Sequence, residues 1–444
     1  MSKVTSQFVC QSCGATFSKW SGKCMQCGAW DSLVESAPLT LNAKVGNVAA
    51  AKPDKLSEIK AAKVPRMSTT IGEVDTVLGG GIVPGSLILL AGDPGIGKST
   101  LVLQLAGILS GQKMNVLYVS GEESASQIKL RAERITGLSE NFDFVATSDL
   151  DSIISLVNKD SYDLVIVDSI QTMSSAASAS AAGTISQVTN GASSLMQAAK
   201  STNTAFILIG HVTKDGNLAG PRLLEHLVDV VLYLEGDRFG MVKFLRGVKN
   251  RFGATDEVGI LEMTGTGLQP VNNPSGLLLE ERSLAPGSVV FAAMEGSRPL
   301  LVEVQALVSP SVFGFPKRAS VGVDLNRLNM LCAVLTKRGG INLSASDVYV
   351  NIVGGLKITE PAIDLAIICA LASAHKNVII DSHLVVFGEV GLSGEIRTVN
   401  NTERRLREAK KLGYKSALTS PHSSLKGMKL PSSIGEAVQI ITKK

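Results

Sequence analysis

Residues 92–100 read GDPGIGKST and match the pattern G-x-x-x-x-G-K-[ST] of a phosphate-binding loop. The apolar run SLILLA precedes this stretch, and LVLQLAGIL, which has a helical composition, follows it. In such a strand–loop–helix unit the glycines let backbone N–H groups surround phosphate oxygens at the helix N-terminus. The candidate nucleotide-binding residues of this loop are Gly92, Asp93, Pro94, Gly95, Ile96, Gly97, Lys98, Ser99 and Thr100.

The loop predicts ATP and Mg²⁺ as ligands. Lys98 is expected to neutralise the β- and γ-phosphates, and Ser99 to bind the magnesium ion. The apolar run LVIVD ends in Asp168, at the position where an aspartate that organises Mg²⁺ belongs. About seventy residues after a phosphate loop, an acid in that place is a second sign of the same site.

Two further residues follow apolar runs that are expected to be neighbouring strands. Glu122 comes directly after the run at residues 116–120, and in a doubly wound sheet this strand end faces the nucleotide. We therefore expect Glu122 to be the general base that activates water, with a pair of solvated acids as the alternative. His211, after another such run, is expected to sense the γ-phosphate, although a histidine that caps a loop fits equally well.

The region around the loop alternates apolar runs with helical stretches. Continuous apolar runs are typical of parallel strands covered on both faces, and the helical stretches would supply the crossovers. The predicted strands are residues 87–91, 116–120, 164–168, 206–210 and 228–234, with a β-rich tail at 242–246 and 258–263. The sequence therefore predicts an α/β fold with a doubly wound sheet over residues 67–272.

Length and composition limit the remaining possibilities. The chain has 444 residues, of which 45% are hydrophobic and 18% charged, which excludes wholesale disorder. The net charge of +4 is too small to predict nucleic-acid binding by itself. Since the sequence lacks a long apolar run and an N-terminal signal peptide, we expect a cytoplasmic protein without a membrane partner.

Two CxxC pairs near the N-terminus predict a zinc site. Four thiolates around Zn²⁺ form a closed tetrahedron, which is structural rather than catalytic, and buried or redox-active cysteines are the weaker alternative. Nucleic acid, a protein partner and support of folding all remain open as the purpose of this module. The predicted ligands are Cys10, Cys13, Cys24 and Cys27.

Residues 72–259 resemble the RecA-like ATPases in the order of the phosphate loop, Glu122, Asp168 and His211. The run KNRFG at residues 249–253, with the four cysteines and the C-terminal region, extends the resemblance to the RadA (Sms) family of bacterial recombination proteins. The resemblance implies a hexameric ring that hydrolyses ATP on single-stranded DNA. It also implies branch migration or unwinding at branched recombination intermediates, in cooperation with the RecA recombinase.

Within the KNRFG run, Lys249 and Arg251 lie two residues apart, so that on a strand they would share a face. There they could reach the nucleotide of the next subunit; a basic patch on a solvated edge strand is the alternative. The RecA-like resemblance also places two DNA-binding loops, at residues 173–187 and 213–222. The second loop carries the candidate DNA contacts Lys214 and Arg222.

The C-terminal region is expected to be an α+β domain and resembles the proteolytic domain of Lon proteases. Ala362 stands where that family has its nucleophilic serine, and Glu403 where it has its lysine base, so we expect no proteolysis. We expect a scaffold that guides DNA through Lys317, Arg318 and Arg327. A regulatory ring ATPase that acts on proteins and an ATP-dependent protease remain the alternative functions.

These interpretations predict a division of the chain into domains and linkers. The expected parts are a zinc finger at 1–35, a linker at 36–66, the RecA-like ATPase at 67–272, a linker at 273–286 and the Lon-like domain at 287–444.

Overall fold

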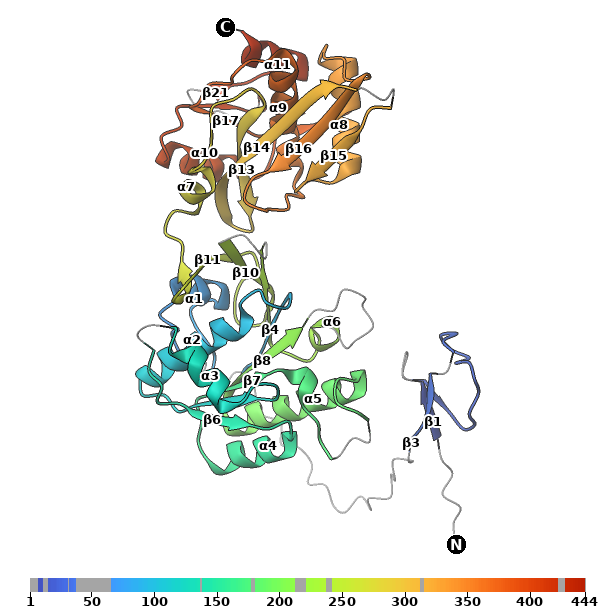
Figure 1. Ribbon diagram of the computed structural model, residues 1–444, viewed down its shortest axis with the longest axis vertical. Coiled ribbons are helices and arrows are strands. Elements are labelled where there is room, and N and C mark those ends of the chain that lie inside the picture. The colour runs from blue at the N-terminus through green and yellow to red at the C-terminus, as the bar shows by residue number, and fades with distance from the viewer. Residues whose placement is uncertain are drawn as a thin grey trace, which may run out of the picture. The chain divides into compact units, whose positions relative to one another are not determined.

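In the computed structural model the described residues are 7–10, 15–30, 32–36, 65–135, 138–176, 180–211, 221–236, 242–311, 315–421 and 428–443 (Figure 1). The chain divides into two units. The first comprises Met1–Thr69, Gly81–Pro94 and Lys98–Val231, and the second comprises Thr70–Gly80, Gly95–Gly97 and Leu232–Lys444. Within the described part of the chain, no helix has both the length and the apolar character needed to cross a membrane.

A parallel sheet forms the centre of the first unit. Its strands pair in parallel, and the members of β4, β5 and β7 are buried along their whole length. In spatial order they are β4 (Leu87–Gly92), β8 (Ala205–His211), β7 (Leu164–Asp168), β5 (Val116–Ser120) and β6 (Asp143–Ala146). The predicted α/β fold with a parallel core is confirmed; β6 escaped prediction because it lies at the edge and exposes both of its ends.

Helices connect these strands. They are α2 (Lys98–Gly111), α3 (Ala125–Ala132), α4 (Leu150–Lys159) and α5 (Ile185–Thr202), with the short α6 (Pro221–Leu224) after β8. Helix α2 packs against β5 and β7, and α5 packs against β4 and β8. Each connection returns the chain to the same end of the sheet, so the carboxyl ends of β4, β5 and β7 form one edge.

Strand β9 (Val230–Glu235) begins in the first unit and ends in the second. The second unit then continues as an antiparallel ribbon of β10 (Val242–Asn250), β11 (Val258–Thr264) and β12 (Gly267–Pro270), as predicted for the β-rich tail. Helix α1 (Gly72–Leu78) contacts β10 and β11. The carboxylate of Glu73 accepts a 2.9 Å hydrogen bond from Ile260 N on β11, which attaches the helix to the ribbon.

The C-terminal part of the second unit is a mixed sheet with helices, as expected for an α+β domain. The strand order is β15 (Arg318–Val321), β16 (Ser346–Ile352), β14 (Arg298–Pro310), β13 (Ser288–Glu295), β17 (Leu384–Val386), β20 (Ser416–Leu418) and β21 (Met428–Lys429). The helices are α8 (Leu325–Arg338), α9 (Asp364–Lys376), α10 (Thr402–Lys411) and α11 (Ile434–Thr442). Helix α9 packs against β13 and β14 and is buried from Asp364 to Ser373.

The turn between β13 and β14 is attached to the β10–β11 ribbon by polar contacts. Arg246 forms a 2.5 Å ion pair with Glu295, and Ser297 Oγ donates a 2.8 Å hydrogen bond to Glu257. On the far side of the turn, Arg298 forms a 2.6 Å ion pair with Glu73 of α1. The predicted linker 273–286 includes the short helix α7 (Pro274–Leu279), which packs against β14.

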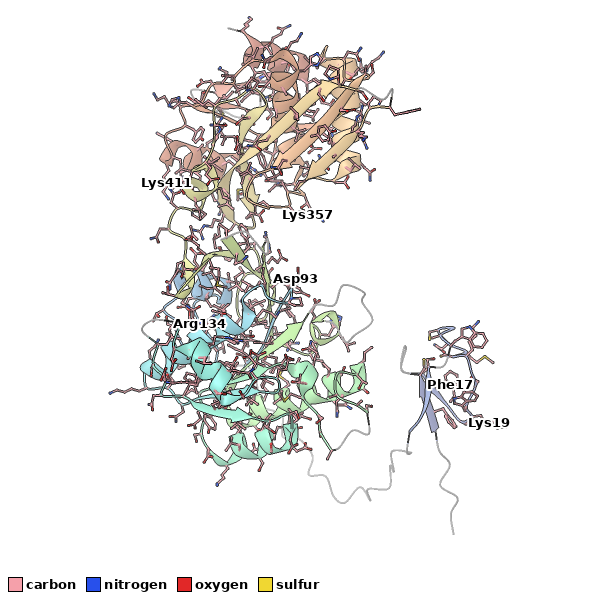
Figure 2. The ribbon with its side chains drawn as sticks, in the orientation of Figure 1. Phe17, Lys19, Asp93, Arg134, Lys357 and Lys411 are labelled. Atoms are coloured by element: carbon pink, nitrogen blue, oxygen red, sulfur yellow. The ribbon has the colours of Figure 1, made fainter. Side chains whose placement is uncertain are left out.

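The N-terminal residues form a small three-stranded sheet in the order β2 (Thr16–Phe17), β1 (Gln7–Cys10) and β3 (Leu33–Ser36). Its core consists of Cys10, Cys24 and Leu33, against which Phe8 and Phe17 pack (Figure 2). So small a core leaves most side chains of this module at the surface.

Candidate functional site

The phosphate loop connects β4 to α2, as predicted. Gly97 has a φ of +117°, and a Cβ at this position would lie 2.5 Å from Met263 Cε, so the turn requires a glycine. Lys98 is only 3% exposed, and its Nζ donates hydrogen bonds to Gly92 O at 2.8 Å and Asp93 O at 3.0 Å. The ammonium is therefore folded over the loop whose phosphate it is predicted to bind.

Burial lowers the pKa of Lys98 from 10.5, while Asp168, Asp93 and Glu122 partly offset this by attraction. The carboxylates of Asp168, Asp93 and Glu122 thus all attract the same ammonium group. An ionisable group whose pKa is shifted by burial and by nearby charges is typical of functional sites.

Asp168 ends β7 and is 8% exposed. The hydroxyl of Tyr118, a fully buried residue of β5, donates a 2.9 Å hydrogen bond to Asp168 Oδ2. Burial, together with the charge of Asp168, raises the pKa of Tyr118 well above its usual value. Tyr118 therefore stays a donor and fixes one oxygen of the carboxylate that is predicted to bind Mg²⁺.

The two glutamates after β5 have different surroundings. Glu123 forms an ion pair with Arg131 of α3, whereas Glu122 Oε1 accepts a 2.9 Å hydrogen bond from Ser169 Oγ. Ser169 is fully buried and directly follows Asp168, so this bond brings Glu122 to the strand end that carries Asp168. The geometry favours Glu122 over Glu123 as the candidate base, and its role in hydrolysis stays a prediction.

Neither Tyr118 nor Ser169 was predicted from the sequence. Tyr118 lies within a run that shows only an apolar pattern, and Ser169 follows the acid that ends another such run. A tyrosine inside a buried apolar run was the available signal, since its hydroxyl needs a partner there.

The remaining residues predicted for this edge are only partly described. His211 is the last residue of β8 and pairs in register with Gly92 of β4, next to the phosphate loop. Lys214 lies outside the described residues. Arg222 lies in α6, and its side chain is likewise outside the described part.

The predicted DNA-binding loop at residues 173–187 is anchored at both ends where it is described. Ser175 Oγ donates a 2.9 Å hydrogen bond to Asp151 of α4. Gln187 Nε2, in the first turn of α5, donates to Ser175 O at 3.4 Å and to Ser180 O at 3.3 Å. These hydrogen bonds hold the described ends of the stretch against α4 and α5.

The KNRFG run differs from its prediction in one respect. Strand β10 ends at Asn250, so Arg251 begins a turn and does not share a strand face with Lys249. The side chain of Asn250 builds this turn: its Nδ2 donates to Val77 O at 3.2 Å, and its Oδ1 accepts from Phe252 N at 2.9 Å. Arg251 is exposed at the tip of a turn that is fixed to α1.

In the C-terminal region, buried ion pairs surround the position predicted for a lost nucleophile. Ala362 is 2% exposed in a short 3-10 helix, and Glu403 lies in the first turn of α10. Next to Ala362, Glu360 accepts hydrogen bonds from both terminal nitrogens of Arg405, at 3.1 and 2.5 Å. Arg405 is 2% exposed, and its guanidinium lies 5.8 Å from the ring centre of Phe387.

Of the cations predicted to contact DNA in this region, Arg327 is already engaged. Its guanidinium forms two hydrogen bonds, of 2.5 and 2.6 Å, with the fully buried carboxylate of Asp364. Lys317 N donates to Asp347, and Arg318 begins the edge strand β15 with its guanidinium 3.3 Å from Asn329 Oδ1. Arg327 therefore contributes an ion pair to the fold, while Lys317 and Arg318 stay candidate DNA contacts.

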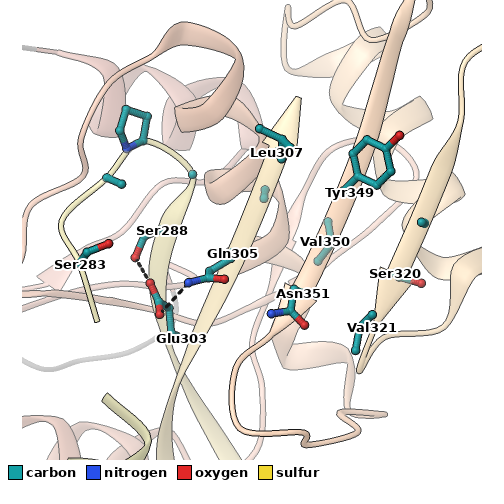
Figure 3. A pocket seen from close by; sticks show the side chains of 15 residues that line it. Ser283, Ser288, Glu303, Gln305, Leu307, Ser320, Val321, Tyr349, Val350 and Asn351 are labelled. Atoms are coloured by element: carbon teal, nitrogen blue, oxygen red, sulfur yellow. Dashed lines mark hydrogen bonds between the residues drawn. The ribbon is translucent and has the colours of Figure 1, made fainter. Parts of the chain in front are cut away.

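An open cavity of about 380 Å³ lies on the C-terminal sheet, between β13, β14, β16 and β15 (Figure 3). Its buried acid, Glu303, accepts hydrogen bonds from Ser288 Oγ and, at 3.1 Å, from Gln305 Nε2. Because these partners satisfy the carboxylate, and because none of the predicted site residues lines the cavity, we assign it no part in catalysis.

The cysteines fit a zinc ion. The Sγ atoms of Cys10, Cys24 and Cys27 lie within 4.8 Å of one another, and those of Cys10 and Cys27 are 3.7 Å apart. Zn–S bonds of about 2.3 Å in a tetrahedron place sulfur atoms nearly 4 Å apart, which agrees with this spacing. Cys13, the fourth predicted ligand, lies outside the described residues.

The two cysteines of the C-terminal region are core residues. Burial raises the pKa of the Cys332 and Cys369 thiols.

Comparisons with known proteins agree with both sites. A family described as an AAA domain matches residues 53–217, and one described as a rubredoxin metal binding domain matches residues 8–35. The crystal structure of the RadB recombinase is 27% identical and covers 46% of this chain and 99% of its own, with a TM-score of 0.38, too low to support any conclusion.

Curated relatives match nearly the whole chain. The DNA repair protein RadA of Halalkalibacterium halodurans is 47% identical over 440 residues, which is 98% of this chain and 96% of the relative. The DNA repair protein RadA of Bacillus subtilis is 47% identical over 441 residues, which is 98% of this chain and 96% of the relative. The one from Rickettsia felis is 49% identical over 428 residues, which is 96% of each chain.

Proposed function

The chain belongs to the RadA family of DNA repair proteins, and on this premise we propose that it is an ATP-driven motor acting on branched recombination intermediates. In this proposal, ATP hydrolysis moves the protein along single-stranded DNA and drives branch migration or unwinding. The observation that carries the proposal is the convergence of Lys98, Asp168 and Glu122 at one edge of the parallel sheet.

The described residues suit separate roles in hydrolysis. Lys98 would leave the carbonyls of Gly92 and Asp93 to bind phosphate oxygens. Asp168, oriented by Tyr118, and Ser99 would hold Mg²⁺, which supplies neutralisation of the phosphate charge when it is bound. Glu122, oriented by Ser169, would accept a proton from the attacking water.

We assign Lys249 and Arg251 to the nucleotide of a neighbouring subunit in a hexameric ring. Arg251 is exposed on a turn that Asn250 fixes to α1, so the cation can project without losing its position. A positioned cation supplied in trans stabilises charge on the transferred phosphoryl group and couples hydrolysis to the contact between subunits.

The C-terminal domain would serve as a scaffold and DNA guide without proteolysis. Ala362 offers no hydroxyl to attack a peptide bond, and Arg405 pairs with Glu360 beside it. Lys317 and Arg318 would contact DNA phosphates, and a ring would repeat this weak contact around its opening. The loop at residues 173–187, Lys214 and Arg222 remain candidate DNA contacts of the ATPase domain, and the RecA recombinase remains a candidate partner.

The decisive experiment measures ATPase activity with and without single-stranded DNA. We expect DNA to stimulate hydrolysis, and we expect Lys249→Ala or Arg251→Ala protein to inhibit wild-type protein when the two are mixed. Inhibition out of proportion to the fraction of variant shows that these side chains act across a subunit boundary. Hydrolysis that ignores DNA would contradict the proposal and favour a regulatory ring that acts on proteins.

A further inference from the structure

The N-terminal zinc module exposes two tryptophans that its core does not use. Trp20 is 58% and Trp30 is 73% exposed, and neither belongs to the small core around Cys10 and Cys24. Tryptophan normally buries most of its large apolar surface on folding. Two indoles left in solvent on so small a module therefore indicate a binding surface.

The two indoles lie close together and are positioned by local structure. A Cβ on Gly22 would be 3.9 Å from the Trp20 ring and 4.0 Å from the Trp30 ring, so both rings border the same point. Lys23 and Trp30 form a β-bridge, and Lys23 Nζ lies 5.5 Å from the Trp30 ring centre. The glycine between the rings leaves a space that a side chain would fill.

The charge around the indoles complements an anionic ligand. Residues 15–30 contain two lysines, Lys19 and Lys23, and no acid; Asp31 follows Trp30 directly. Lys19 lies on the same module (Figure 2). Aromatic faces with neighbouring cations are the surface that binds single-stranded nucleic acid, because bases stack on the rings and phosphates meet the ammonium groups.

We propose that Trp20 and Trp30 stack on bases of single-stranded DNA while Lys19 and Lys23 contact its phosphates. The zinc module is then a second DNA contact, separate from the ATPase loops. This inference rests on the proposed function in one respect, namely that the chain uses single-stranded DNA.

The chain itself provides the test, because Trp20 and Trp30 are its only two tryptophans. Selective excitation of tryptophan in the full-length, zinc-loaded protein therefore reports on this surface alone. We expect saturable quenching on titration with oligothymidylate, and none with an abasic oligomer of the same length and charge. Two results would overturn the inference. One is equal quenching of tryptophan fluorescence by the two oligomers. The other is the absence of quenching by oligothymidylate when a labelled oligothymidylate is shown to bind.

Variants give an independent measurement. Trp20→Ala with Trp30→Ala should weaken oligothymidylate binding about 10-fold or more, since stacking contributes roughly 1–3 kcal/mol per base. Trp20→Phe with Trp30→Phe should retain most of the affinity, and Met25→Ala, at a site that is 84% exposed on the same module, should change nothing. Zinc content verifies folding, and the wild-type titration stands even if the alanine variant loses zinc.

The possible failures are distinguishable. If DNA stimulates the ATPase but the double alanine variant binds oligothymidylate as tightly as wild type, the inference falls while the proposed function stands, and the indoles belong to a protein contact. If single-stranded DNA does not stimulate ATP hydrolysis, the proposed function is wrong.

Discussion

The phosphate loop and the Ala362 region both gather buried charges, but they satisfy them differently. At the phosphate loop, Lys98 makes its two hydrogen bonds to uncharged carbonyls, with Asp168 and Glu122 near enough to attract it. Around Ala362, by contrast, Arg405 and Arg327 each meet a carboxylate through two nitrogens. A buried ion pair commits both of its charges, and removal of one partner leaves the other uncompensated. A cation held only by uncharged carbonyls, by contrast, still has its charge available to a ligand.

Lys98→Ala tests the first half of this comparison and has the largest expected effect. ATPase activity should fall about 10³-fold, the upper end for one lost charge-stabilising donor, because the phosphates lose their cation. Steady-state hydrolysis measures the loss. The variant should fold normally, and Lys159→Ala, an exposed change at the end of α4, is the matched control. Surviving hydrolysis would show that residues 92–100 do not bind the substrate phosphates.

Arg405→Met tests whether the paired charges near Ala362 serve the fold. Removal of the guanidinium leaves the Glu360 carboxylate without its cation and the Ala292 carbonyl without this donor, although Met294 N still donates to Glu360. We expect this to cost about 3 kcal/mol in the free energy of unfolding. Urea denaturation measures this cost. Arg407→Met, an exposed change on the same helix, should stay within about 0.5 kcal/mol of wild type. If Arg405→Met abolishes ATPase activity without loss of stability, the pair is functional and the comparison fails.

Tyr118→Phe sharpens the account of the magnesium site. The Asp168 carboxylate loses a hydrogen bond of about 1 kcal/mol, so the Mg²⁺ concentration for half-maximal ATPase should rise several-fold. Tyr162→Phe is the matched control, because Tyr162 donates a similar 2.8 Å bond to Asp143 at the sheet edge. A shift of equal size in both variants would refute a specific role for Tyr118.

The smallest expected effect is that of Lys98 on the pH dependence of the free energy of unfolding. Because burial lowers the pKa of Lys98 in the folded state, the unfolded chain binds more protons between that lowered pKa and 10.5. The folded wild-type protein should therefore gain stability relative to Lys98→Met as the pH rises through this interval. Denaturation of both proteins at a series of pH values measures the difference, and a constant difference would contradict the proposed burial of a charged ammonium.

The central strands of the parallel sheet were largely predictable from the sequence, because buried parallel strands are continuous apolar runs. Strand β4 was expected at residues 87–91 and observed at Leu87–Gly92, and β7 agrees at both ends. The short edge strand β6 was missed, since half-exposed residues carry no such pattern.

The candidate site was predictable where chemistry depends on spacing along the chain. The phosphate loop and Asp168 belong to this group. Tyr118 and Ser169 could not be found in this way, because their contacts join β5 to the end of β7 across the sheet. The pairing of Arg327 with Asp364 likewise depends on the packing of α8 against α9, so a sequence that shows only a basic cluster predicts a DNA contact instead.

The polar contacts of the β13–β14 turn have a mechanical consequence. Arg246 and Glu257 attach this turn to the ribbon of β10 and β11, and Glu73 attaches it to α1. We expect these contacts to stiffen the junction, so that the ribbon, the helix and the turn move together as one element.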